Sequence, residues 1–267
     1  DGLIGDVEAC QSVFSLDDVP SCSSERDGTC LSSQQKEALS PIFSGAITAS
    51  GEAFYAPFPF DTGIASPDYN FWDFFAPLVL DSGGVGLIWG VPVADPATFN
   101  GPEFALTGSI DDMLTSIEST DDIYTEAASS FMIPPNNAEA LSAVRDRGAK
   151  IMVYHGVSDA IFSALDTINW YNNLTANHND DASDFARLYL MPGMGHCSGG
   201  AAVDQVDLLT PLVAWVESGI EPEGLVATAR GAGNPGGETS EPTTAAPTPT
   251  VDPLEVISMF SDAYTDV

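Results

Sequence analysis

The sequence predicts an α/β fold with a parallel sheet in the second half of the chain, and two observations support this fold class. Two short apolar segments have the composition of buried parallel strands, namely IMVYHG at 151–156 and FARLYLMPG at 185–193. The segment between them, ALDTINWYNNLTAN at 164–177, has the pattern of a helix. Because strands that alternate with helices form parallel sheets, residues 131–220 are expected to be the end of such a sheet.

Three further helices are predicted from apolar spacing and from residues that begin or end helices. The first begins the segment 31–47, where Ser32 or Ser33 can cap it. The second lies in 138–150 and ends at Gly148. The third lies in 206–219, where Pro211 is near a kink or in an early turn.

The first half of the chain has a different residue pattern. From 48 to 108, Gly, Pro and aromatic residues alternate without a long periodic segment, which predicts an irregular region. Residues 111–130 are acidic and weakly helical. We therefore expect residues 1–130 to form a separate, mostly irregular lobe, whose aromatic side chains either fill a small core or line an apolar surface.

The end of the chain changes composition again. Residues 229–253 are rich in Thr, Pro and Gly, which is typical of a linker that cannot bury enough apolar surface to order itself. In residues 254–267 the apolar positions recur every three to four residues, which predicts a short terminal helix that docks on this protein or on a neighbour.

Composition restricts the classes of function. The chain has 7 Lys and Arg against 39 Asp and Glu, a formal net charge of −32. Such a charge repels phosphate backbones and anionic lipid head groups, so nucleic acid and membranes are not expected as partners. No run approaches the roughly 18 apolar residues of a membrane-spanning helix. The acidic excess favours a saline or extracellular setting, where salt screens self-repulsion.

Four cysteines give a second indication of the compartment. Cys22 and Cys30 bracket a short polar loop, a spacing that predicts a local disulfide and hence an oxidising environment. Cys10 and Cys197 are left to bond to each other or to partners outside this chain. The first residues, DGLIGD, contain no Met and no signal-peptide pattern, so a signal has been removed or the chain is part of a longer polypeptide.

The three histidines narrow the candidate chemistry. His178 lies in a polar stretch and is expected to be solvated, whereas His155 ends a predicted strand. Asp159 and His196 each follow a predicted strand, at the sheet edge where functional residues of α/β proteins gather. An acid after one strand and a His after the next form the second half of a Ser…Asp…His order.

The sequence alone leaves two possibilities for the nucleophile of such a triad. A nucleophile elbow needs small residues two before and two after the Ser. Ser158 has Gly156 and Ala160 at these positions, but as nucleophile it would require an acid other than Asp159. The alternative is a nucleophile that precedes residue 1.

Several of these segments resemble the tannase and feruloyl esterase family over most of residues 1–228. The resemblance is carried by HGVSD at 155–159 and GMGHC at 193–197, and by DGLIGDVEAC and CLSSQQKEALSPIFSGAITASGEAFY near the start. It implies an α/β-hydrolase core with a lid inserted between nucleophile and acid. Residues 1–130 would then be lid-like, with a partial calcium loop, and residues 131–228 the C-terminal half of the core.

The resemblance also implies roles for single residues. Asp159 would be the triad acid and His196 the general base, while Cys197 would bond a Cys that precedes the nucleophilic Ser. The elbow with that Ser lies upstream of the lid in the family, and no matching segment is present in this sequence. Asp1, through its carboxylate, and Leu3, through its carbonyl, would bind a structural calcium ion (Ca2+). Cys10 would pair with a Cys upstream of residue 1.

Two functions are therefore expected. The first is a secreted serine esterase, a carboxylic-ester hydrolase for aromatic acid esters whose Ser lies outside this chain. A missing N-terminal part or partner chain, disulfide-linked through Cys10 and Cys197, would supply the Ser. The second is a catalytically inactive hydrolase-like surface or assembly protein, which the missing elbow and the unusual tail favour.

Overall fold

The computed structural model describes residues 4–23, 28–66, 69–131, 138–200, 202–230 and 250–251. The chain divides into two compact units, each described by itself below. Unit 1 comprises Asp1–Ala46, Tyr55–Ser66 and Asn136–Val267, and unit 2 comprises Ile47–Phe54 and Pro67–Pro135.

The division of the chain at residue 130 is revised by these units, because much of the first lobe belongs with the strands. The Tyr55 hydroxyl accepts a hydrogen bond from the Ser163 backbone N–H at 2.9 Å. The Ser163 hydroxyl donates to the carbonyl of Pro57 at 2.5 Å. The Gln11 side chain accepts from the Phe60 N–H at 2.7 Å. The two bonds of Ser163 join residues 55–66 to the elements that follow residue 136, and the bond of Gln11 joins the start of the chain to the same segment.

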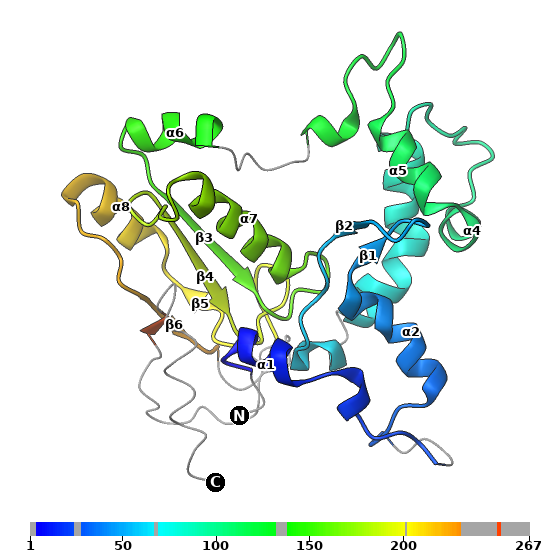
Figure 1. Cartoon of the computed structure of the whole chain (residues 1–267), viewed down its shortest axis with the longest axis horizontal. Coiled ribbons are helices and arrows are strands. Elements are labelled where there is room, and N and C mark those ends of the chain that lie inside the picture. Colours follow the sequence, from blue (N-terminus) through cyan, green and yellow to red (C-terminus); the bar gives the residue numbers. More distant parts are fainter. Residues whose placement is uncertain are drawn as a thin grey trace. The chain divides into compact units, whose positions relative to one another are not determined.

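The predicted parallel pair is present in unit 1 (Figure 1). Strands β3 (Ile151–Gly156) and β4 (Ala186–Met191) run parallel, with Ile151 opposite Ala186 and Gly156 opposite Met191. Helix α7 (Ala164–Asn177) connects them. The crossover therefore places the ends of both strands at the same edge of the sheet, as the alternation of strand and helix predicts.

Side chains of β4 alternate between two buried clusters, so both faces of the strand are covered. On one face Ala186 packs with Leu174 of α7 and Leu141 of α6 (Ala138–Asp146). On the other face Tyr189 and Met191 pack with a different cluster, made of Met194, Ala202, Leu225 and Ala227.

Unit 1 has eight further described elements. They are α1 (Val7–Val13), η1 (Leu16–Asp18), α2 (Ser33–Ser44), η2 (Thr62–Ala65), β5 (Gln205–Val206), α8 (Leu209–Ser218), β6 (Leu225–Thr228) and β7 (Thr250–Val251).

Local sequence explains where the predicted helices begin and end. Ser32 caps α2, and the side chain of Gln35 accepts from its backbone N–H in a reciprocal capping box. Gly148 adopts φ +78 just after α6, a backbone conformation that glycine tolerates. Pro211 lies in the first turn of α8, where its missing N–H breaks no helical hydrogen bond.

The predicted tail lies largely outside the described residues. Most of the 229–253 linker and all of the 254–267 helix fall there. Within that linker, Thr250 and Val251 pair antiparallel with Val226 and Leu225, so these two residues of the expected linker form a strand.

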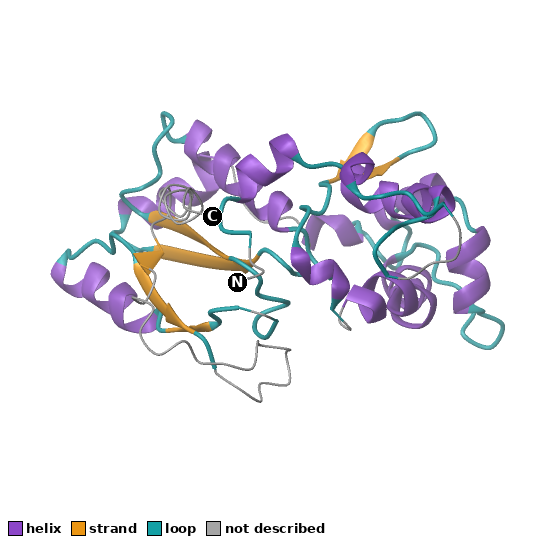
Figure 2. Cartoon of the chain, turned by 90° about the horizontal axis from the view of Figure 1, so that it is seen from below, coloured by secondary structure: helices purple, strands orange, loops and turns teal. Residues whose placement is uncertain are grey.

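Unit 2 is mainly helical, which corrects the prediction of an irregular region at 48–108 (Figure 2). Three consecutive π-helical segments lie between residues 70 and 89, and in each of them the capping N–H bonds to the carbonyl five residues earlier. Because that spacing differs from the 3.6-residue period, apolar residues in such a segment give no ordinary helical pattern. The π-helical segments are η3 (Asn70–Phe75), η4 (Pro77–Asp81) and η5 (Gly84–Trp89).

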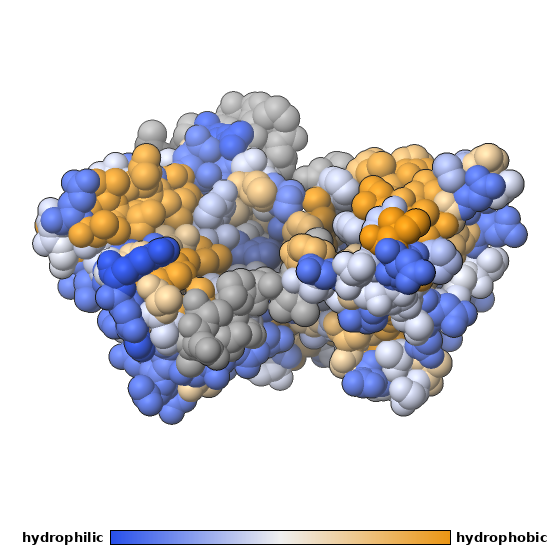
Figure 3. Space-filling model, turned by 90° about the horizontal axis from the view of Figure 1, so that it is seen from above, coloured by the Kyte–Doolittle hydropathy of each residue, from blue (hydrophilic) through white to orange (hydrophobic). Residues whose placement is uncertain are grey.

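The remaining elements linked to unit 2 are short. They are the paired strands β1 (Ala46–Ile47) and β2 (Ala53–Tyr55), and the helices α4 (Gly101–Thr107), α5 (Ile110–Glu118) and η6 (Ala128–Phe131). Many large apolar side chains of this unit are exposed, and hydrophobic residues gather over it in Figure 3. Within the described residues, no helix is both long and apolar enough to cross a bilayer.

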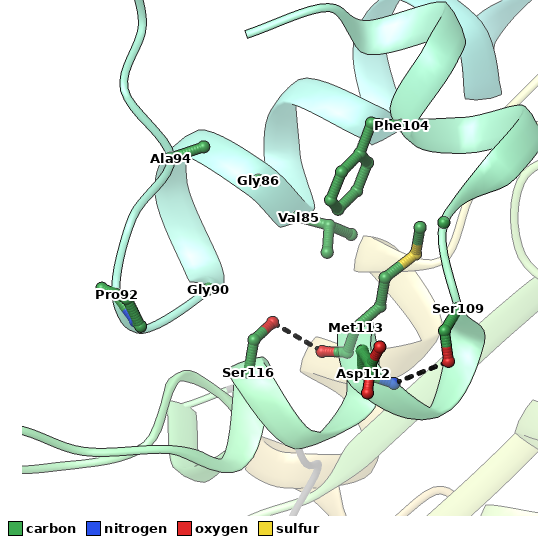
Figure 4. A pocket seen from close by; sticks show the side chains of 11 residues that line it. Val85, Gly86, Gly90, Pro92, Ala94, Phe104, Ser109, Asp112, Met113 and Ser116 are labelled. Atoms are coloured by element: carbon green, nitrogen blue, oxygen red, sulfur yellow. Dashed lines mark hydrogen bonds between the residues drawn. The ribbon is translucent and has the colours of Figure 1, made fainter.

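Unit 2 contains a small apolar pocket of about 270 Å³. The side chains of Val85, Phe104 and Met113 lie around the same space in Figure 4. Among the described residues that line it, Asp112 is the one with an ionisable side chain. The pocket therefore offers an apolar cavity without a base and nucleophile pair.

Candidate active site

The carboxyl ends of β3 and β4 bring Asp159 and His196 together. Asp159 lies in the turn after β3, and His196 in the loop after β4. The His196 Nδ1 is 2.9 Å from the Asp159 Oδ2. A carboxylate can only accept a hydrogen bond, so Nδ1 carries the proton and donates it. The proximity of the two residues expected from their positions at the strand ends is thus present in the structure.

Glycines allow the two loops to pack this closely. A Cβ on Gly156 would collide with the carbonyl oxygens of Met194 and Gly195. Without that Cβ, the Ser158 N–H donates to the Met194 carbonyl at 2.9 Å. The glycine in the HGVSD segment is thus needed for backbone contact with the loop that carries His196.

Asp159 is buried, with 4% of its surface exposed, and four donors surround its carboxylate. The backbone N–H groups of Ile161 and Phe162 donate to Oδ1 at 2.8 and 3.0 Å. His196 and His155 approach Oδ2. Burial favours the neutral acid, but hydrogen bonds from His155, the two N–H groups and His196 outweigh it and lower the pKa of Asp159. The carboxylate is therefore held in its ionised form.

His155 is a site residue that sequence reasoning did not identify as one. Its Nε2 lies 3.3 Å from the Asp159 Oδ2 and 3.0 Å from the Phe162 carbonyl oxygen. Its Nδ1 lies 2.7 Å from the Thr167 hydroxyl. The position of His155 at the end of a strand, four residues before Asp159, was the available signal.

His196 presents its other face to solvent. The His196 side chain is 39% exposed, and its Nε2 has no hydrogen-bond partner among the described residues. The ring of Phe162 lies 5.5 Å from the imidazole, between centroids, and Phe162 is itself 54% exposed. An oriented imidazole with a free nitrogen beside an exposed aromatic ring can act as a general base towards a bound hydroxyl.

Ser158 does not occupy the position of a nucleophile in this structure. The Ser158 side chain is buried, and its hydroxyl donates to Asp61 Oδ1. Burial also raises the pKa of Asp61. No hydrogen bond joins Ser158 to His196 within the described residues. The small residues around Ser158 in GVSDA (156–160) therefore reflect the packing at Gly156 and the bond from Ser158 to Asp61, and not a nucleophile elbow.

A buried carboxylate anchors the loop that presents His196. The Asp204 Oδ2 accepts from the Gly199 N–H at 2.6 Å and lies 2.9 Å from the guanidinium of Arg230. The Asp204 side chain is fully buried. Asp204 therefore links the histidine loop to the chain that follows β6.

The cysteines follow the sequence prediction in part. Cys22 and Cys30 form the predicted disulfide. Cys10 and Cys197 are not bonded to each other, and both are free thiols in the structure. Cys197 is exposed beside His196 and has φ +62.

His178 was expected to be solvated, and that expectation is wrong. It is only 5% exposed, and its Nδ1 lies 2.9 Å from the Leu174 carbonyl, to which it donates. Its ring packs against Phe185. The polar neighbours in the sequence belong to a turn that covers the histidine at the end of α7.

The two expected calcium ligands, Asp1 and Leu3, lie outside the described residues. Asp6, the next acidic residue, accepts a hydrogen bond from the Ala9 N–H and caps α1. Among the described residues, no group of three or more His, Cys, Asp or Glu is placed to hold a metal ion.

A larger pocket of about 610 Å³ in unit 1 lies among α1, α7 and β4 and does not contain the Asp159–His196 pair. Its apolar lining comes from the α7 and β4 faces, including Ile168, Tyr171, Leu188 and Leu190.

Comparisons with known proteins match this chain to ester hydrolases. The family model for tannase and feruloyl esterase matches residues 109–249. A mono(2-hydroxyethyl) terephthalate hydrolase of Piscinibacter sakaiensis is 33% identical over 85% of this chain and 41% of its own length. A probable feruloyl esterase B-2 of Aspergillus flavus is 24% identical over 85% of this chain and 43% of its own.

Solved structures share the fold. An esterase from Aspergillus oryzae matches with a TM-score of 0.61 and 19% identity, over 94% of this chain and 48% of that structure. Feruloyl esterase B from the same organism matches with a TM-score of 0.59 and 20% identity, over 85% and 44%. The chain spans less than half the length of these relatives. The chain belongs to the tannase and feruloyl esterase family.

Proposed function

We propose that this protein is a carboxylic-ester hydrolase for esters of aromatic acids, in which Asp159 and His196 are the acid and base of a Ser-His-Asp triad. The observation that carries the proposal is the 2.9 Å contact between His196 Nδ1 and Asp159 Oδ2, with Nε2 left open. The names of the similar proteins, which are ester hydrolases, support the same class of reaction.

Proton movement follows from this geometry. The Nε2 of His196 takes the proton of a serine hydroxyl as its oxygen bonds to the ester carbonyl carbon. Asp159 stays ionised and stabilises the imidazolium. The imidazolium then gives the proton to the leaving alcohol as the ester C–O bond breaks. Water, deprotonated by the same nitrogen, then bonds to the acyl carbon; the bond between this carbon and the serine oxygen breaks, the imidazolium returns the proton to the serine, and the acid is released.

The aromatic substrate class rests on Phe162. Its exposed ring lies next to the imidazole, where it can stack on an aromatic group bonded to the scissile carbonyl. The printed names of the relatives, a terephthalate monoester hydrolase and feruloyl esterases, support an aromatic acid. We further propose that unit 2 acts as the lid, which its many exposed aromatic residues support.

The nucleophile is proposed to lie outside the 267 residues. Ser158 is buried against Asp61, and the relatives are more than twice as long as their matched parts. The free thiols of Cys10 and Cys197 are proposed to form disulfides with the part that supplies the serine. Secretion is part of the proposal, since the Cys22–Cys30 disulfide needs an oxidising compartment. A structural calcium ion at Asp1 and Leu3 stays a prediction, tested by the melting temperature with and without a chelator.

The test begins with protein isolated without reductant, together with any polypeptide disulfide-bonded to it. Intact mass, labelling with a fluorophosphonate, and hydrolysis of methyl ferulate and of mono(2-hydroxyethyl) terephthalate are measured. A single labelled serine outside this chain, with hydrolysis that His196→Ala abolishes, supports the proposal. Absence of both labelling and hydrolysis would overturn it and favour an inactive hydrolase-like assembly protein. Labelling of Ser158 would reject the external nucleophile.

A further inference from the structure

His155 has three polar neighbours that determine where its proton lies. The Phe162 carbonyl and the Asp159 carboxylate are both acceptors, at 3.0 and 3.3 Å from Nε2. Neither can donate a proton, so Nε2 must carry one. The Thr167 hydroxyl, 2.7 Å from Nδ1, can donate to the bare nitrogen of the neutral ring. The neighbours thus select the Nε2–H tautomer of His155.

The proton on Nε2 is shared between two acceptors that belong to one turn. Asp159 and Phe162 begin and end that turn, and the Phe162 N–H returns to Asp159 Oδ1. His155 therefore ties the end of β3 to both ends of the turn. The His155 side chain is only 13% exposed, so water competes little for these bonds.

We propose that His155 is a positioning residue for the catalytic pair, which holds Asp159 Oδ2 in line with the Nδ1 of His196. The proposal rests on the function proposed above. The two backbone donors fix only Oδ1. Without His155, Oδ2 would have His196 as its only donor among the described residues, and the carboxylate could turn about its last side-chain bond. A second imidazole on the same oxygen removes that freedom.

Other ionisable groups act on this cluster and enter the design of the test. Asp166, at the start of α7, interacts electrostatically with His155, and the phenol of Tyr55 interacts with both Asp159 and Asp166. These groups are left unchanged in every variant below. All variants are measured at the same pH.

The experiment observes the proton between His196 and Asp159 directly. The full chain is purified as wild type and as His155→Phe, His155→Gln, Thr167→Val and Asp159→Asn. One-dimensional ¹H spectra at low temperature are recorded for the low-field imidazole N–H signals, with three histidines in the chain to assign. The Asp159→Asn variant changes the N–H signals of both His155 and His196, and His155→Gln, which has no imidazole at position 155, identifies which of the two belongs to His196.

The buried His178 provides an internal control for folding. Its Nδ1–H donates to the Leu174 carbonyl at the end of α7, and it is not bonded to the Asp159 cluster. We expect His155→Phe to lose the His196 signal or move it upfield while the His178 signal stays in place. His155→Gln, which keeps an N–H donor, should restore it in part, and Thr167→Val should shift it less than His155→Phe.

An unchanged His196 signal in a folded His155→Phe variant would overturn the proposal. Loss of the His178 signal in His155→Phe would show that this variant is unfolded. The Thr167→Val variant then decides, and an unchanged His196 signal in it would overturn the proposal. In hydrolytically active protein, His155→Phe should lower kcat by up to about 10²-fold with little change in KM. If wild type proves inactive, the proposed function fails, whereas the spectra still decide the role of His155.

Discussion

The two compact units treat their apolar side chains differently. Unit 1 has two buried apolar clusters, one on each face of β4, beside the strand ends that carry Asp159 and His196, although other large apolar side chains of this unit are exposed. In unit 2, Phe74, Phe75 and Ile88 are half or more exposed, as are other large apolar residues. A rigid core suits a site that must keep two side chains within hydrogen-bonding distance. An open apolar surface suits contact with a ligand or another surface.

The two units also differ in how they treat a carboxyl group that is removed from water. Asp159 in unit 1 has four donors, and its pKa is lowered despite burial. Asp73 in unit 2 has a buried Oδ2 without a hydrogen-bond partner among the described residues, and burial raises its pKa to about 7. Burial alone therefore pushes a carboxyl towards neutrality, and donors decide whether it stays charged. The predictions below test this contrast.

The largest effect is expected from Asp159→Asn. The amide can donate to His196 and so favours the wrong tautomer of the imidazole, with its proton on Nε2. In the hydrolytically active protein, kcat should fall by roughly 10³- to 10⁴-fold, measured by steady-state hydrolysis of methyl ferulate. Asp184→Asn, an exposed residue just before β4, serves as the matched control. A loss below tenfold would remove Asp159 from the triad.

A smaller but clear effect is expected from Gly156→Ala. The new Cβ would press on the carbonyls of Met194 and Gly195, which cannot rotate away as a side chain could. Unfolding by urea should show a loss of about 1–3 kcal/mol, and the His196 loop should move. An unchanged midpoint together with unchanged hydrolysis would mean that the two loops are not packed as described.

The strand ends of unit 1 could be predicted because the relevant signals are local. IMVYHG is a strand as predicted, although only Gly156 of its six residues is buried, and the helix at 164–177 has the bounds expected for it. Two parallel strands with one crossover then bring Asp159 and His196 to one edge without further information. The pairing of Cys22 with Cys30 is likewise a short-range signal.

The rest depended on contacts that no local pattern encodes. His155 becomes a site residue through its distances to Asp159 and Phe162, and Ser158 is excluded by its bond to Asp61, which is 97 positions away. His178 is buried by the tertiary packing of Phe185. In unit 2, π-helical hydrogen bonding removed the 3.6-residue period on which the prediction of helices relies.

Asp73→Asn is expected to stabilise unit 2 in a pH-dependent way. A folded pKa of about 7, above the ordinary 3.8, means that the folded state binds more protons than the unfolded state between these values. Stability should therefore fall as pH rises from about 4 to 7 in wild type. The variant should lack this fall, with a gain on the order of 1 kcal/mol at pH 8 after solvent screening.

Thermal melts of both proteins at pH 4 and pH 8 measure this difference. Equal melting temperatures at pH 8 would contradict the raised pKa of Asp73. Asp159 changes stability with pH in the opposite direction. Its pKa is lower in the folded state, so it contributes stability above pH 3.8, and this stability is lost as pH falls through the folded pKa. Asp159→Asn should therefore flatten the acid side of the stability curve, where Asp73→Asn has no effect.

The smallest effect separates two glycines of one helical run. Gly83 has ordinary helical φ and nothing within 4 Å of an added Cβ, whereas a Cβ on Gly86 would collide with the ring of Phe99. Gly83→Ala should gain about 0.5–1 kcal/mol, because alanine loses less backbone entropy on folding. Gly86→Ala should instead lose stability, since Phe99 must leave its position. If both substitutions gave the same sign in urea unfolding, the packing of Phe99 against η5 would be wrong. Opposite signs would show that unit 2, despite its exposed apolar surface, has a specific interior at Gly86.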